Sequence, residues 1–149
     1  MNVTSGSTWP DLPARSLDPD LVTSEVRGAV EEVSANFPDS QVLAWPDGEG
    51  GVFLVIDDLD IGEVWAPRVS WLGCRVLNAY PEADVYPIFV RGDLARSDGK
   101  PLAAPMHPNQ QFAGQPAVMV SRTSSRRSPS TSSAAVRLVN TLTFLREHQ

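Results

Sequence analysis

Residues 106–120 read Met-His-Pro-Asn-Gln-Gln-Phe-Ala-Gly-Gln-Pro-Ala-Val-Met-Val, and the interpretation of the whole chain depends on this stretch. It holds a His-Pro-Asn turn at 107–109, a glycine at 114, and the small residue Ala117 at the start of an apolar run. Proline and asparagine are common turn residues, so 107–109 alone predicts no more than a surface turn. The spacing of Gly114 and Ala117 after the turn favours a functional segment instead.

Two amphipathic helices are predicted on either side of this stretch. Over residues 18–37, apolar side chains recur at three- and four-residue steps and form one stripe. Asp18 is the expected N-cap, with Pro19 at the first helical position, and Pro38 ends the helix. A second apolar stripe predicts a C-terminal helix over 135–147.

Short apolar segments between the helices predict an antiparallel meander of four strands. The predicted strands cover 41–45, 52–56, 69–77 and 85–90. Alternation in the third strand places Cys74 on the same face as Leu72 and Val76, so the thiol is expected to be inert, with a raised pKa. The acidic residues 57–60 are expected in a solvated loop and not in a cation site, because no calcium-loop spacing follows them.

The order of elements predicts an α+β fold with one domain over 18–149, preceded by a flexible arm over 1–17. The chain has 149 residues and a net charge of −6, which disfavours nonspecific binding to nucleic acid. No apolar run is long enough to span a membrane. The first residues lack the regions of a signal peptide, and the single cysteine excludes an internal disulfide, so we expect a cytoplasmic protein.

In this order and spacing, the central stretch resembles the active-site segment of ubiquitin-conjugating enzymes. Members of that family place a glycine five residues after His-Pro-Asn and the thioester-forming cysteine eight residues after it; those positions are Gly114 and Ala117 here. Tyr80-Pro81 resembles the Tyr-Pro that follows the family's third strand, and Ser128-Pro129 resembles the Ser-Pro before the last helix. The extended 91–105 segment is similar to the divergent bacterial branch of the family.

The resemblance implies a fold and a set of roles. The fold is an N-terminal helix, a four-stranded antiparallel meander, an irregular active-site loop and a C-terminal helix. Position 117 corresponds to the acyl-accepting cysteine, and Asn109 to the residue that orders the loop and donates to the oxyanion. His107, Pro108 and Gly114 correspond to residues that shape the loop. The implied partners are an activating enzyme, a ubiquitin-like protein and a target protein, with no cofactor and no metal.

Alanine at position 117 has no nucleophilic atom, so the chain as written cannot form the family's thioester. Either a native cysteine has been replaced, or the protein is a naturally inactive variant that binds a ubiquitin-like protein as an adaptor. The intact His-Pro-Asn favours the first explanation, a thioester carrier in disarmed form. Ser121 is no substitute nucleophile, because the sequence shows no evident His or Lys partner for it. An unrelated α+β interaction domain remains a third hypothesis.

Overall fold

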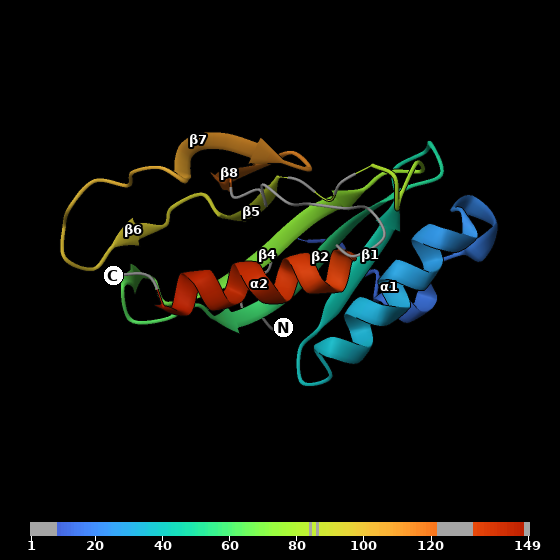
Figure 1. Cartoon of the computed structure of the whole chain (residues 1–149), viewed down its shortest axis with the longest axis horizontal. Coiled ribbons are helices and arrows are strands. Elements are labelled where there is room, and N and C mark those ends of the chain that lie inside the picture. The colour runs from blue at the N-terminus through green and yellow to red at the C-terminus, as the bar shows by residue number, and fades with distance from the viewer. Residues whose placement is uncertain (1–8, 84, 86, 122–132, 148–149) are drawn as a thin grey trace.

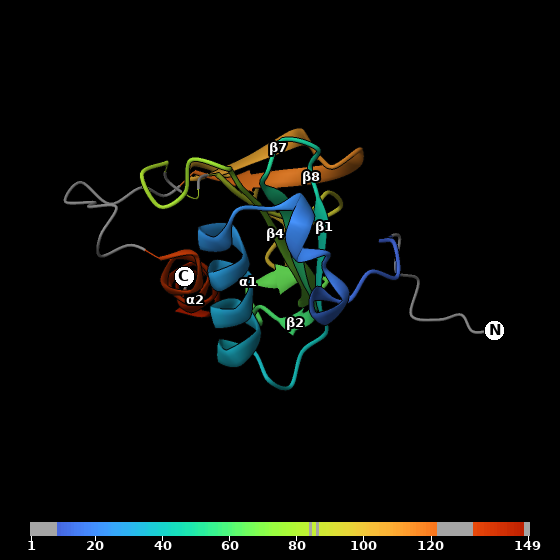
Figure 2. The same ribbon diagram turned by 90° about the vertical axis from the view of Figure 1, so that its right-hand side faces the viewer.

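The computed structural model describes residues 9–83, 85, 87–121 and 133–147. These residues form an α+β fold in which two helices cover one face of a six-stranded antiparallel sheet (Figures 1 and 2). The sheet order is β1-β2-β4-β5-β8-β7. Its strands are β1 (Val42–Pro46), β2 (Val52–Asp60), β4 (Val69–Val76), β5 (Ile88–Arg91), β7 (Met106–Phe112) and β8 (Gln115–Val120). A separate pair joins β3 (Trp65–Ala66) to β6 (Ala95–Arg96).

The predicted N-terminal helix is present but begins later than its sequence suggests. Helix α1 (Ser24–Asn36) is capped by Thr23, whose Oγ1 accepts a hydrogen bond from the Val26 amide at 3.1 Å. Asp18 caps only a short 3-10 turn (Pro19–Leu21), because Val22 is extended and bridges to Gly50. The apolar stripe of α1 is buried as predicted, and the helix ends before Phe37.

All four predicted strands exist, with small shifts at their ends. In β4, Ser70, Leu72, Cys74 and Val76 face the helices as alternation predicts, whereas Trp71 and Arg75 face the opposite side. The prediction of a loop at 57–60 is wrong. Strand β2 continues to Asp60 through a register shift between Ile56 and Leu59, where Asp58 takes a φ of 55°.

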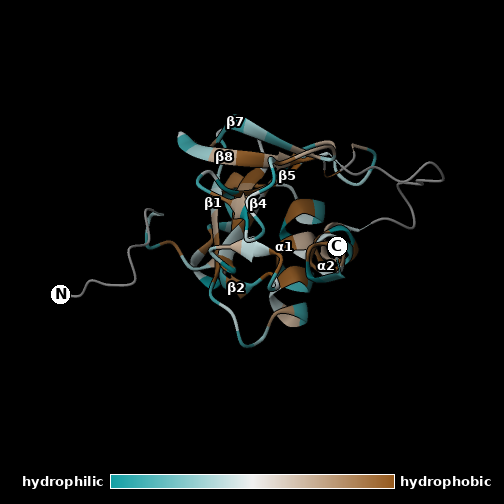
Figure 3. Cartoon of the chain, turned by 90° about the vertical axis from the view of Figure 1, so that its left-hand side faces the viewer, coloured by the Kyte–Doolittle hydropathy of each residue, from teal (hydrophilic) through white to brown (hydrophobic). Residues whose placement is uncertain are grey.

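The irregular loop predicted over 106–120 is a β-hairpin, so the sheet has six strands and not four. Its turn is the pair Ala113-Gly114, with φ angles of 50° and 83°. Positive φ at both central residues defines the two-residue turn whose twist matches antiparallel strands. The hairpin adds β8 beside β5 and leaves β7 at the sheet edge. Accordingly, β7 is mostly hydrophilic and β8 mostly hydrophobic (Figure 3).

Part of the expected flexible arm lies against the sheet. Residues 9–13 run along the side of the sheet opposite the helices (Figure 2), and the Leu12 carbonyl accepts a hydrogen bond from the Ala44 amide at 3.0 Å. Pro13 bridges to Leu43 of β1. The Trp9 side chain is buried. This segment therefore covers the β1 edge and part of the outer face of the sheet.

Helix α2 (Ala134–Glu147) is the predicted C-terminal helix. Two aromatic side chains hold its ends. The Tyr80 hydroxyl accepts a hydrogen bond from the Ala134 amide at 3.2 Å, and Trp65 Nε1 donates to the Leu145 carbonyl at 2.9 Å. The Ser128-Pro129 step predicted before this helix lies outside the described residues.

Candidate functional site

His107-Pro108-Asn109 lies within edge strand β7. His107 still pairs with Met119 of β8, but the register then jumps to Gln110 opposite Ala117, which places Pro108 and Asn109 in a bulge. Asn109 has a φ of 66°, a left-handed conformation that asparagine tolerates better than most residues. Both bulge residues are exposed. The motif therefore shapes an exposed bulge in the edge strand.

The hairpin gives Ser121 the partner that sequence reasoning did not find. His107 Nε2 lies 2.7 Å from Ser121 Oγ, and that hydroxyl donates to the Pro105 carbonyl at 3.3 Å. Which of the two groups donates in the His107–Ser121 hydrogen bond depends on the tautomer of the imidazole. Within the described part of the chain, no carboxylate contacts the His107 ring to orient it. The pair links β7 to the residue that follows β8, at the open end of the hairpin. It lacks the arrangement of a catalytic dyad.

Ala117, the position that corresponds to the family's cysteine, lies inside the sheet. It pairs with Arg91 of β5 on one side and with Gln110 of β7 on the other. Its exposed fraction is 1%, and it belongs to an apolar cluster with Trp9 and Phe112 on the outer face of the sheet. A side-chain atom added at its Cβ would therefore lie within this buried cluster and not at the surface.

The other predicted site residues, described next, have structural roles in a turn, a helix cap and a connection. Gly114 occupies the second position of the hairpin turn, where its φ of 83° suits glycine. Tyr80 caps α2 through its hydroxyl, and Pro81 follows it in the connection between β4 and β5. These residues lie on different elements from the His-Pro-Asn bulge. The bulge and Ala117 lie on the two paired strands of one hairpin, whereas Tyr80 and Pro81 lie in another connection.

Cys74 is fully buried under the helices, and burial raises the pKa of its thiol to about 12. The thiolate is the nucleophilic form of cysteine, so this side chain is inert near neutral pH, as predicted. No cluster of three or more potential metal ligands occurs among residues 9–83, 85, 87–121 and 133–147. Within the same ranges, neither helix has the length and apolar character needed to cross a membrane.

The outer face of the sheet carries the most distinctive surface of the molecule. Six aromatic side chains, here called the aromatic layer, lie in a connected set of ring contacts across five strands and the N-terminal segment. The aromatic layer consists of Trp9, Trp45, Phe53, Trp71, Phe89 and Phe112. Ring centroids are 4.9 Å apart for Trp9 and Trp71, and 5.2 Å apart for Phe89 and Phe112. The alternation of β4, which directs Trp71 and Arg75 outward, was the sequence signal for this surface.

Phe112 reaches the layer because the hairpin tip folds over β4 at Gly73. A Cβ at Gly73 would lie 2.6 Å from Cε2 of the Phe112 ring, closer than two carbon atoms can approach. Glycine at this position therefore leaves the space that the ring fills. The contact holds the hairpin tip against the centre of the outer face.

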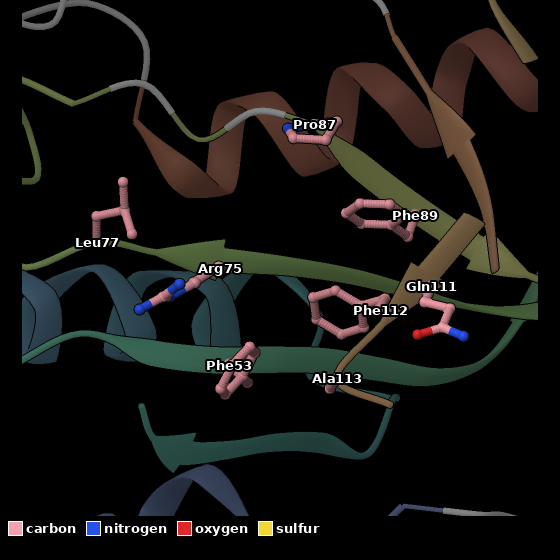
Figure 4. A pocket seen from close by; sticks show the side chains of 8 residues that line it. All are labelled: Phe53, Arg75, Leu77, Pro87, Phe89, Gln111, Phe112 and Ala113. Carbon is pink, nitrogen blue, oxygen red and sulfur yellow. The ribbon is translucent and has the colours of Figure 1, made fainter. Parts of the chain in front are cut away.

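Beside Phe112 the layer opens into a pocket of about 280 Å³, here called the aromatic pocket (Figure 4). Leu77 and Arg75 lie opposite the rings of Phe89 and Phe112, with Phe53 below them in this view. The lining residues are Phe53, Arg75, Leu77, Pro87, Phe89, Gln111, Phe112 and Ala113. The pocket is mostly apolar and contains one charged group.

Arg75 is held in place by acidic residues of the turn between β1 and β2. Its Nε donates to Asp47 Oδ2 at 2.9 Å, and its guanidinium lies 5.4 Å from the centre of the Phe53 ring. The Asp47 side chain is only 1% exposed, and it also accepts hydrogen bonds from the amides of Glu49 and Gly51. Burial by itself would raise the pKa of Asp47, but these hydrogen bonds and the Arg75 charge outweigh it, and the pKa is lowered.

No protein-family model, curated protein or solved structure matches this chain. The likeness to ubiquitin-conjugating enzymes therefore consists of the motifs in the sequence. The structure adds an α+β fold with a mostly antiparallel sheet and two helices, which is compatible with that family.

Proposed function

We propose that the protein is a non-enzymatic binding module of the ubiquitin-conjugating type, an adaptor for a ubiquitin-like protein. The burial of Ala117 within β8 carries this proposal. The expected partner class comes from the ordered motifs of the sequence, and the antiparallel sheet with two helices is compatible with it.

The chemistry of thioester exchange supports a binding role over a carrier role. An acyl-accepting thiol must ionise and must reach the incoming thioester. Position 117 lies between two neighbouring strands and is 1% exposed, so a thiol there would be desolvated. Cys74, which is enclosed in the same sheet, shows the consequence: the pKa of its thiol is about 12.

A thioester carrier whose cysteine is replaced by Ala117 is the second candidate. It is favoured by the intact His-Pro-Asn and by the spacing to Gly114 and Ala117. In this candidate the outer face around β8 would have to open before position 117, which is buried, could react. The two candidates therefore differ in whether position 117 is accessible in the native protein.

Thiol labelling tests that difference directly. The variants Ala117→Cys and Asn109→Cys place a new thiol inside β8 and on the exposed bulge, respectively, with Cys74 kept as a buried reference. After treatment with N-ethylmaleimide under native conditions, mass spectrometry counts the labels. We expect rapid single labelling of Asn109→Cys and labelling at least about 100-fold slower for Ala117→Cys. Equal labelling rates would mean that position 117 is accessible in the native protein. The binding role would then lose its main support, and the thioester carrier would be favoured.

The partner is tested with the cognate ubiquitin-like protein, activating enzyme and ATP. We expect saturable binding of the ubiquitin-like protein to the native chain without ATP, measured by calorimetry. We expect no reductant-sensitive band from Ala117→Cys in the complete reaction. A band that disappears with reductant, and that the native chain does not form, would establish the carrier. Absence of both binding and band would overturn both candidates.

A further inference from the structure

The aromatic pocket has the features of a binding site on a face that no helix covers. Its walls are preformed, because Phe89 and Phe112 stack on each other and Phe112 is held over Gly73. Its polar group, Arg75, is fixed by Asp47. A preformed apolar cavity with few fixed polar groups is the usual composition of a ligand site. Neither His107 nor Ala117 lines it, although Gln111, Phe112 and Ala113 of the same hairpin do.

The size of the pocket limits what it can hold. Its volume of about 280 Å³ lies just below the range of roughly 300–1,000 Å³ typical of small-molecule sites. One large side chain and its adjoining peptide group match such a space better than a nucleotide or a flavin does. Three phenylalanine rings and Leu77 line it, which favours an aromatic or branched aliphatic side chain.

The hydrogen-bond partners of Arg75 and the charges beside it indicate which polar group of a ligand this residue would bind. Its Nε is bonded to Asp47, and its Nη2 lies 3.7 Å from Glu49, a loose contact at the surface. Among the residues that the structure describes, none accepts a hydrogen bond from its Nη1. The described residues therefore leave the Nη1 donors of Arg75 available to a ligand. Two carboxylates already face this one cation, so a further carboxylate would add repulsion, whereas a neutral carbonyl would not.

We propose that the aromatic pocket binds one large apolar side chain of a partner peptide, whose backbone carbonyl accepts a hydrogen bond from Arg75. The pocket geometry alone carries this inference, and it does not depend on the proposed adaptor function. The binding surface consists of the outer face of β2 and β4, the start of β5 and the tip of the β7–β8 hairpin.

The test uses N-acetyl-phenylalaninamide as the probe, titrated into the isotopically labelled full chain and followed by NMR. We expect saturable shifts of the Leu77 and Ala113 methyl groups and of the Arg75 Nε–H, with a dissociation constant on the order of 1 mM. N-acetyl-phenylalanine has the same ring but a carboxylate in place of the amide, and we expect it to bind more weakly. Tighter binding of the carboxylate would overturn the choice of a neutral carbonyl partner and identify an anion site.

Two tryptophan variants, one just after β4 and one at its start, provide the matched comparison. Leu77 is 39% exposed at the pocket, and Val69 is 42% exposed on the same face near the other end of β4. Leu77→Trp fills the pocket and should weaken probe binding at least about tenfold, whereas Val69→Trp should change it less than twofold. Circular dichroism confirms that both variants fold. Shifts that do not saturate, or that persist unchanged in Leu77→Trp, would overturn the proposal.

Discussion

The two faces of the sheet are built from different side chains. The inner face is aliphatic, and α1 and α2 close it so completely that Leu54, Ile56 and Leu72 have no exposed surface. The outer face is aromatic; Trp45, Phe53, Trp71 and Phe89 are only partly buried there. Leucine and isoleucine pack densely in a closed core. Aromatic side chains have few rotatable bonds, so they present apolar area at a surface and lose little conformational entropy on binding. The inner face therefore mainly stabilises the fold, and the outer face can also bind.

The largest expected effect comes from the inner face. Leu54→Ala removes a fully buried side chain at the centre of β2, beneath both helices. We expect the free energy of unfolding to fall by about 3–4 kcal/mol, from lost burial and the cavity that remains. Urea denaturation measures it. A loss below about 1 kcal/mol would mean that the two faces are not divided as described.

A smaller effect is expected where the hairpin tip meets β4. Gly73→Ala introduces a methyl group into the space of the Phe112 ring and should cost about 1–3 kcal/mol through overpacking. The double variant Gly73→Ala/Phe112→Leu provides the control. The double variant should lose less stability than the two single variants lose together, because the shorter side chain relieves the clash with the new methyl group. Simple additivity would mean that Phe112 does not lie over Gly73 in solution.

The Asp47–Arg75 pair gives an intermediate effect that depends on pH. Asp47→Asn should cost about 1–2 kcal/mol at pH 7, because a charged acceptor of three hydrogen bonds is lost. The pKa of Asp47 is lowered on folding, so its contribution is present above the unfolded value of about 3.9 and is lost as the pH falls through the folded value. Acid titration of unfolding should therefore show a steeper loss in the native protein than in Asp47→Asn. Parallel curves would contradict this.

The smallest effect is expected at the rim of the aromatic pocket. Leu77→Ala removes a side chain that is 39% exposed and should change the free energy of unfolding by no more than about 0.5 kcal/mol. The same variant should weaken binding of the N-acetyl-phenylalaninamide probe. Thermal denaturation and NMR titration of one sample measure both quantities. A large loss of stability would assign Leu77 to the fold and not to the pocket.

Local patterns in the sequence determined the regular elements. The stripe of α1, the end of that helix at Phe37 and the two faces of β4 follow from periodicity and from one proline, because each depends on residues within a few positions. The same alternation predicted that Cys74 would be buried and inert. Which elements lie next to one another in the fold, in contrast, cannot be predicted from any single segment.

Only the tertiary structure decided what residues 106–120 do. As an isolated motif they indicated an irregular active-site loop; pairing with β5 makes them two further strands of the sheet. That pairing buries Ala117, gives His107 the partner Ser121, and places Phe112 over Gly73, 39 positions earlier by the printed numbering. Contacts between distant segments depend on sheet order and register, and a short motif specifies neither. For the same reason the aromatic pocket, built from four separate strands, exists only in the folded chain.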